Sequence, residues 1–200
     1  MTSEALTAHL QPSSGPSSVA AVAEDRLRPA RWGLWFFIAS ESCLFAAFIA
    51  ARYVIAGVYR PEELDQALGL AITSVLLGSS LTAYLAEAFA KQGRYDRAQV
   101  FLWATVGLGC VFLGGVALEF HEGAKFFPPS TDYGTAFFSL VSLHAFHVLT
   151  GIVALMLAAN LIRLGRLPEL GYWRVEAVVK YWHFVDLAWV IIFPTLYLVS

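Results

Sequence analysis

The 200-residue sequence contains few charged residues and only two cysteines. Asp, Glu, Lys and Arg make up 14% of it, against roughly a quarter of a soluble domain. Cys43 and Cys110 lie in apolar runs without CxxC spacing, so nothing indicates a disulfide framework or a thiolate metal site. The formal net charge of −2 leaves no basic excess to neutralise phosphates, so we expect no nucleic-acid partner.

The sequence also lacks the motifs of several enzyme classes. It contains no Gly-rich phosphate loop, no Ser/His/Asp arrangement and no pair of positioned carboxylates. Hydrolysis and phosphoryl transfer therefore receive no support. Residues 1–30 are rich in Ser, Pro and Ala and lack the apolar stretch of a signal peptide, so we expect a disordered cytoplasmic tail there.

Long apolar segments dominate the remainder of the chain. Hydrophobic residues make up 58% of the sequence, and the mean hydropathy is +0.63. A helix needs about 20 residues to cross about 30 Å of hydrocarbon, and helices satisfy their own backbone hydrogen bonds there. We therefore predict an all-α integral membrane bundle of five transmembrane helices, with residues 31–200 forming the transmembrane domain. The five segments are 32–58, 67–90, 98–119, 133–162 and 176–199.

Basic residues gather in the tail and in alternate loops, whereas the first and third loops are acidic. Because Lys and Arg are retained on the cytoplasmic side of short loops, this pattern predicts a cytoplasmic N-terminus and an external C-terminus. The basic positions are Arg26, Arg28, Arg31, Lys91, Arg94, Arg97, Arg163, Arg166 and Arg174.

Small residues recur at four-residue spacing in the second and third segments. The second contains Thr73, Ser74, Gly78, Ser79 and Thr82, including Ser74-xxx-Gly78-xxx-Thr82, and the third contains Cys110-xxx-Gly114. Such stripes let helix backbones approach closely in membranes. We therefore predict close helix contacts at these positions.

Glu41 lies within the first apolar segment, where an ionised carboxylate costs about 3 kcal/mol or more. It should face the bundle or a partner. One interpretation is a proton or ion relay. The other, which we favour, is a neutral, hydrogen-bonded carboxyl that fixes helix packing.

His144 and His147 are three residues apart and share a helix face, as do His183 and Asp186. Imidazoles on facing helices can ligate haem, and a nearby carboxylate can orient a ligand histidine. The membrane segments offer no other ligand-like histidine and no Cys cluster, so we favour interhelical hydrogen bonding, at about 0.6 kcal/mol per pair. We predict no catalytic, cofactor-binding or metal-binding residue in this chain.

Two acids, Glu119 and Glu122, end the third apolar segment at the predicted outer interface. We expect them to be solvated or to meet a partner subunit.

Six segments, in this order and spacing, resemble subunit III of the haem-copper respiratory oxidases, the cytochrome c oxidase subunit 3 family. Any one alone would be a weak signal, but together they span the chain beyond the tail. The segments are RWGLWFFIASE (31–41), TSVLLGS (73–79), EFHE (119–122), YGTAFF (133–138), HAFHV (144–148) and YWHFVDLAW (181–189).

The resemblance implies a subunit of a proton-pumping terminal oxidase in aerobic respiration, without haem or copper of its own. It implies packing beside catalytic subunit I, which it stabilises during sustained turnover, within a complex that includes subunit II and other subunits. Haem and copper are expected in those partners, electrons arrive indirectly from cytochrome c, and phospholipid is bound in a cleft.

The resemblance also implies roles for particular residues. In that family the carboxylate matching Glu41 is buried in the membrane and reacts with carbodiimides, and the positions matching His183 and Asp186 belong to one buried helix face. The chain lacks the first two helices of the seven-helix form, which puts a complete lipid cleft within one chain in question. Five-helix versions occur in bacteria, which implies a multi-pass protein of the bacterial plasma membrane.

Three alternatives stay open. One is subunit III of a quinol oxidase or a homologue associated with a nitric oxide reductase, although YWHFVD and Ser40-Glu41 favour the cytochrome c type. A small proton or ion channel centred on Glu41 belongs to another class; the absence of inverted halves argues against a carrier. A membrane haem protein would use His144, His147 or His183.

Overall fold

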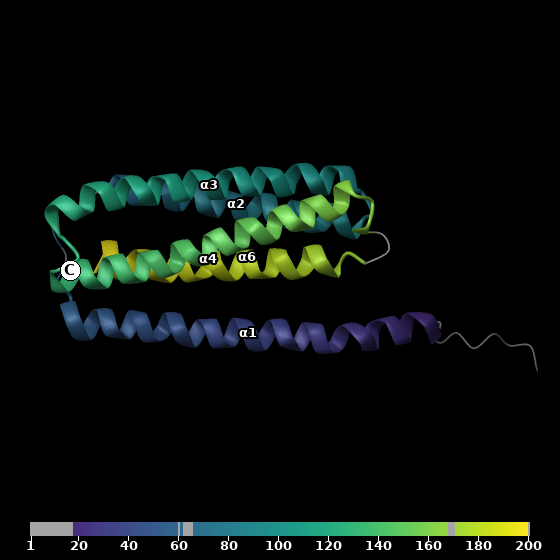
Figure 1. The fold of residues 1–200 in the computed structure, drawn as a ribbon, viewed down its shortest axis with the longest axis horizontal. Coiled ribbons are helices and arrows are strands. Elements are labelled where there is room, and N and C mark those ends of the chain that lie inside the picture. The colour runs from purple at the N-terminus through teal and green to yellow at the C-terminus, as the bar shows by residue number, and fades with distance from the viewer. Residues whose placement is uncertain (1–17, 60, 62–65, 168–170, 200) are drawn as a thin grey trace, which may run out of the picture. The chain divides into compact units, whose positions relative to one another are not determined.

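The structure, a computed structural model, describes residues 18–59, 61, 66–167 and 171–199. Five helices in these ranges are long and apolar enough to cross a membrane, the first of them over its part Leu27–Ala56. This confirms the predicted all-α fold with five transmembrane helices. The helices are α1 (Ser18–Ala56), α2 (Gln66–Lys91), α3 (Tyr95–Phe126), α4 (Asp132–Arg163) and α6 (Trp173–Tyr197) (Figure 1).

The chain divides into two compact units, Met1–Phe37 and Ile38–Ser200. Within the first unit α1 begins at Ser18, so helical structure starts earlier than the boundary predicted at residue 31. The reason is local, because residues 18–28 are rich in Ala, Leu, Glu and Arg, which favour helix. Residues 1–17 of the predicted tail lie outside the described residues.

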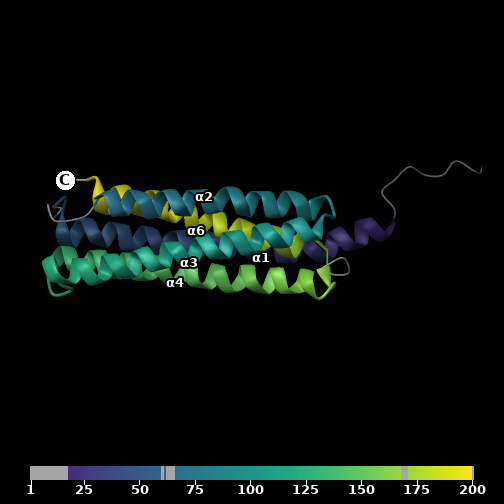
Figure 2. The ribbon, with the colours of Figure 1, turned by 90° about the horizontal axis from the view of Figure 1, so that it is seen from above.

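In the second unit, α2, α3, α4 and α6 form a four-helix ring. Helix α2 packs against α3, α3 against α4, α4 against α6, and α6 against α2. Consecutive helices of the ring run in opposite directions (Figures 1 and 2). The α2–α3 and α4–α6 connections therefore share one end of the ring, which we call the basic end because it carries Lys91, Arg94, Arg97, Arg163, Arg166 and Arg174. This arrangement is compatible with the predicted orientation, which stays a prediction.

Trp182 fills the centre of the ring. Its side chain is fully buried, and its Nε1 donates a hydrogen bond to Ser79 Oγ on α2 at 3.0 Å. The indole also lies against Gly109 of α3 and Gly151 of α4, where a Cβ atom would come within 2.8 Å of a ring carbon. Because a side chain at either glycine would overlap the indole, Trp182 and these two glycines together set the spacing of the four helices.

The prediction of close helix contacts at the small-residue stripes is wrong for Gly78 and Gly114. No described atom outside the local backbone lies within 4 Å of where a Cβ would sit on Gly78 or Gly114. Both glycines point away from the ring, and Ser74 and Cys110 are exposed as well. Four-residue spacing marks a helix face but does not say whether that face is turned inward.

Helix α1 contributes little to the core of the second unit. Of residues 38–56, all of which are described, only Phe45 and Arg52 are buried. The Phe45 ring lies 4.9 Å from the His147 ring on α4 and 6.1 Å from the Phe184 ring on α6, measured between centroids. This part of α1 is therefore attached to the ring by few apolar side chains, and its polar contacts carry more weight.

Candidate functional site

Glu41 and His147 form a polar link between α1 and α4. Glu41 Oε2 lies 3.0 Å from His147 Nε2, and the imidazole is buried, whereas the Glu41 side chain is 19% exposed. His147 Nδ1 lies 2.8 Å from the carbonyl oxygen of Leu143. A carbonyl can only accept, so Nδ1 carries a hydrogen and donates it.

That tautomer constrains the proton between the two side chains. If the imidazole is neutral, its Nε2 is an acceptor, and Glu41 must be the protonated acid that donates to it. If instead Nε2 also carries a hydrogen, an imidazolium faces a carboxylate. In both cases the pair shares one proton and has no net charge, which makes its place in the apolar bundle tolerable.

The pair is enclosed by aromatic side chains. The Phe45 ring packs on the His147 ring, and the Tyr181 hydroxyl lies 3.4 Å from the backbone carbonyl oxygen of His147, to which it donates. Three helices, α1, α4 and α6, therefore meet at this point. Such a site can brace the helices and hold one proton.

A second polar cluster joins α2 to α6. Ser80 Oγ donates a hydrogen bond to Asp186 Oδ2 and lies 3.1 Å from His183 Nδ1. Asp186 is buried, while Ser80 and His183 are half-buried. The sequence placed His183 and Asp186 on one helix face, and the structure brings them to a common serine.

His144 lies in the aromatic core and not in either polar cluster. Its side chain is fully buried, with the Trp189 ring 4.7 Å, the Phe112 ring 5.6 Å and the Phe45 ring 6.3 Å from the imidazole centroid. Among the described residues neither imidazole nitrogen has a hydrogen-bond partner. The packed rings occupy the space that a haem plane would need beside this imidazole.

The two other histidine candidates already have polar partners, His147 in Glu41 and Leu143, and His183 in Ser80. Within the described ranges, no group of three or more His, Cys, Asp or Glu side chains could hold a metal ion. The described part of this chain therefore offers no cluster of ligands for a copper ion.

Glu119 and Glu122 have different surroundings in the structure, because Glu119 is buried and Glu122 is exposed. Helix α3 continues to Phe126, so both acids lie within its last turns. Glu122 is exposed and pairs with Lys125 at 2.8 Å, as expected for a solvated residue. Glu119 is only 3% exposed, so the expectation of a solvated side chain is wrong there, because the helix turns this position toward the ring.

Arg52 was missed by sequence reasoning. Its buried guanidinium donates to the carbonyl oxygens of Gly57 and Tyr59, just beyond the end of α1, and lies 5.8 Å from the centroid of the Tyr133 ring. Carbonyls at a helix C-terminus lack intrahelical donors and favour a cation. A cation in the last turns of α1, before the Gly57 turn, was the available signal.

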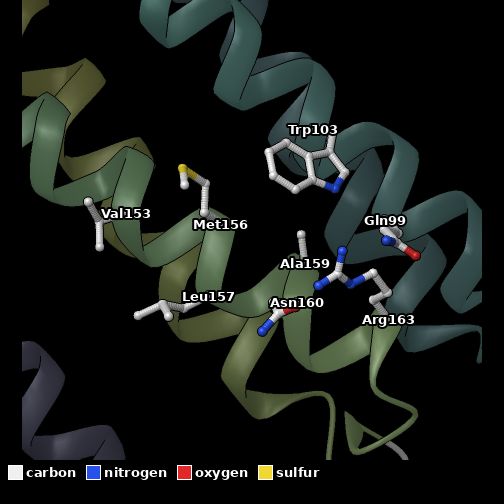
Figure 3. Close-up of a pocket in the computed structure, with 8 residues that line it drawn as sticks. All are labelled: Gln99, Trp103, Val153, Met156, Leu157, Ala159, Asn160 and Arg163. Carbon is white, nitrogen blue, oxygen red and sulfur yellow. The ribbon is translucent and has the colours of Figure 1, made fainter.

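A shallow groove runs between α3 and α4 toward the basic end. Its volume is about 320 Å³. Apolar side chains line one part, and polar side chains lie at the other, where Arg163 extends from α4 toward Gln99 of α3 (Figure 3). The lining residues are Gln99, Trp103, Val153, Met156, Leu157, Ala159, Asn160 and Arg163.

These features define a multi-pass membrane protein whose intramembrane acids and imidazoles pair between helices. The family model for cytochrome c oxidase subunit III matches residues 21–200. The chain therefore belongs to the cytochrome c oxidase subunit III family of the haem-copper oxidases, as the six motifs had indicated. It is a subunit of a respiratory oxidase complex of the cytochrome c or quinol type.

Individual relatives agree with this family. The chain is 34% identical to cytochrome c oxidase subunit 3 of Alkalihalophilus pseudofirmus, over 84% of this chain and 85% of the relative. It is 35% identical to the Bacillus subtilis cytochrome c oxidase subunit 3, with the same two coverages. It is 28% identical to the cytochrome bo(3) ubiquinol oxidase subunit 3 of Pseudomonas aeruginosa, over 84% of each chain.

Proposed function

We propose that this chain is the accessory subunit of a proton-pumping terminal oxidase in a bacterial plasma membrane. In this role it packs against catalytic subunit I, within a complex that includes subunit II, and prolongs its turnover without holding a catalytic cofactor. Family membership supports the proposed packing against subunit I, and the paired polar side chains support the accessory role. The observation that carries the proposal is the Glu41–His147 pair, in which an intramembrane acid and an imidazole bond to each other and link α1 to α4.

The chemistry of the candidate residues supports bracing over reaction. The Glu41–His147 pair, whose imidazole is buried, shares a single proton and has no net charge. Ser80 joins His183 and Asp186, and His144 is packed among aromatic rings. The first two arrangements use polar groups to fix helices relative to one another, and His144 does so through ring packing, which limits helix movement during catalysis in a neighbouring subunit.

We propose cytochrome c as the indirect electron donor. In support, the chain is 34% and 35% identical to the two cytochrome c oxidase subunits above, against 28% for the ubiquinol oxidase subunit and 32% for a probable quinol oxidase subunit 3 of Staphylococcus aureus. Purified complex should reduce oxygen with reduced cytochrome c and not with ubiquinol. Oxygen reduction with ubiquinol alone would assign the quinol type instead.

The accessory role is tested by comparing complexes with and without this chain. We expect removal of the chain to leave most of the initial rate of oxygen reduction and to shorten the time over which turnover continues. An oxygen electrode records both quantities from one trace. Complete loss of the initial rate in a complex that retains its haems would contradict the accessory role, since it would make this chain part of the reaction.

We also propose that the α3–α4 groove holds a phospholipid. Val153, Met156 and Leu157 suit an acyl chain, and Arg163 at the basic end suits a phosphate. Arg163→Gln should lower the phospholipid phosphorus retained by the delipidated complex, whereas Arg166→Gln, at an exposed position outside the groove lining, should not. Equal phosphorus in the wild type and both variants would remove this groove as a lipid site.

A further inference from the structure

The outer side of α2 and α6 carries a polar cluster half-way along two membrane-spanning helices. On α2 the residues Leu77, Ser80 and Tyr84 follow at three- and four-residue spacing, and so do His183, Leu187 and Val190 on α6, so each set shares one helix side. We call these six residues the α2–α6 face. Leu77, Tyr84, Leu187 and Val190 are exposed, while Ser80 and His183 are half-buried.

The hydrogen bonds within the cluster fix the state of the histidine. The single hydroxyl hydrogen of Ser80 is donated to Asp186 Oδ2. His183 Nδ1, 3.1 Å from the same hydroxyl oxygen, must therefore donate to it. In the neutral imidazole the other nitrogen, Nε2, is then an acceptor.

Two acceptors of this cluster are left without a donor in the described part of the chain. No described residue forms a hydrogen bond to His183 Nε2, and the buried Asp186 Oδ1 has none either. Among the described residues, neither Lys91 nor Lys180 forms a hydrogen bond to these acceptors; Lys91 pairs with Glu87 and Lys180 pairs with Glu176, each at 2.6 Å. The cluster is therefore partly exposed among apolar side chains, and two of its hydrogen-bond acceptors have no donor in the described part of the chain.

Hydrocarbon cannot supply the missing donor. An unsatisfied polar group in the bilayer core costs several kcal/mol, and intramembrane polar residues nearly always face protein or water. Acyl chains would cover Leu77, Leu187 and Val190 adequately but would leave His183 Nε2 unbonded. A protein helix with one polar side chain would cover the apolar residues and also donate a hydrogen bond to His183 Nε2.

We propose that the α2–α6 face docks against a transmembrane helix of a partner oxidase subunit, which presents a hydrogen-bond donor to His183 Nε2. The inference rests on the proposed function, because it names the face through which the chain joins the complex. The donor is a hydroxyl, amide or indole side chain near the middle of that helix. The apolar residues of the face pack on either side of this bond.

Photo-crosslinking in the assembled complex tests the location of the interface. Leu187→benzoylphenylalanine places the probe on the α2–α6 face, and Leu157→benzoylphenylalanine places it on α4, where the side chain is equally exposed at 61% against 59%. We expect a covalent adduct with another oxidase subunit from position 187 and none from position 157. Lipid adducts alone at 187, or protein adducts in equal yield at both positions, would overturn the proposal.

Two substitutions of the histidine test the bond. His183→Asn keeps an amide near Ser80 and removes the outward nitrogen, whereas His183→Gln reaches the place of Nε2. We expect the fraction of complexes that keep this chain through detergent purification to fall about threefold for the asparagine variant and to be restored by the glutamine variant. Equal retention of wild type and His183→Asn would overturn the proposed bond.

The outcomes separate this inference from the proposed function. If the wild-type chain purifies without any other oxidase subunit, the proposed function itself fails. If it purifies with them but crosslinks only through α4, the function stands and the α2–α6 face is not the interface.

Discussion

Replacing Glu41 distinguishes a neutral hydrogen bond from a required charge. Glu41→Gln keeps an amide that can donate to His147 Nε2, 3.0 Å from the present carboxyl oxygen, whereas Glu41→Ala removes the link. Ser42→Ala is the matched control, because Ser42 is the next residue, is exposed, and within the described ranges bonds only to the carbonyl of Ile38 in its own helix.

The structure sets the expected magnitudes. Hydrogen bonds between membrane helices contribute about 0.6 kcal/mol on average and up to about 1.7 kcal/mol. Only Phe45 and Arg52 of residues 38–56 are buried, so little apolar packing compensates for the loss. We expect Glu41→Ala to cost about 1 kcal/mol, and Glu41→Gln and Ser42→Ala to stay within about 0.5 kcal/mol of the wild type.

Denaturant titration of the purified complex, with α1 followed by a fluorescent label, measures these differences. A double-mutant cycle with His147→Ala isolates the pair, because Glu41→Ala should then add little further loss. A cost of about 3 kcal/mol or more for both Glu41→Gln and Glu41→Ala would contradict a neutral hydrogen bond. That result would mean that a buried imidazolium needs the carboxylate charge.

Two further predictions concern packing and helix ends. Gly109→Val should destabilise the fold by about 1–3 kcal/mol, because its Cβ would lie 2.8 Å from the Trp182 ring. Gly114→Val is the control and should have a smaller effect, since its Cβ would meet no described atom within 4 Å. Thermal unfolding measures both variants, and equal losses of stability would contradict the packing of Gly109 against Trp182. Arg52→Met should cost about 1–3 kcal/mol, because the carbonyl oxygens of Gly57 and Tyr59 lose a charged donor. We expect the chain after α1 to be cleaved faster in limited proteolysis of this variant. An unchanged cleavage rate would show that Arg52 does not hold this segment in place.

Composition and periodicity were sufficient to predict the transmembrane helices. Apolar runs longer than about 20 residues have few alternatives to a helix, so the four helices of the ring were predicted. Their ends differ from the prediction by three residues or fewer, except that α3 continues seven residues further, to Phe126. The start of α1 was missed, because the Ser/Pro-rich composition of residues 11–18 concealed the helix-forming residues that follow.

Pairing between distant side chains was less accessible from the sequence. Local spacing put His144 and His147 on one helix side, yet His144 packs among aromatic rings and His147 bonds to Glu41. Three residues correspond to about 300° of helix rotation, enough to give two neighbours different surroundings. The role of Ser80 depends on tertiary contacts, which no single-sequence pattern contains, whereas Arg52 bonds to carbonyls close by in the sequence and had a local signal.

The distribution of cofactors between subunits tests the central claim most directly. Haem and copper can be quantified per subunit I in complexes purified with and without this chain, using absorbance spectra and metal analysis. If the intramembrane acids and imidazoles brace helices and meet a partner, both values are the same in the two preparations. A haem or copper that is lost from the complex together with this chain would contradict the account.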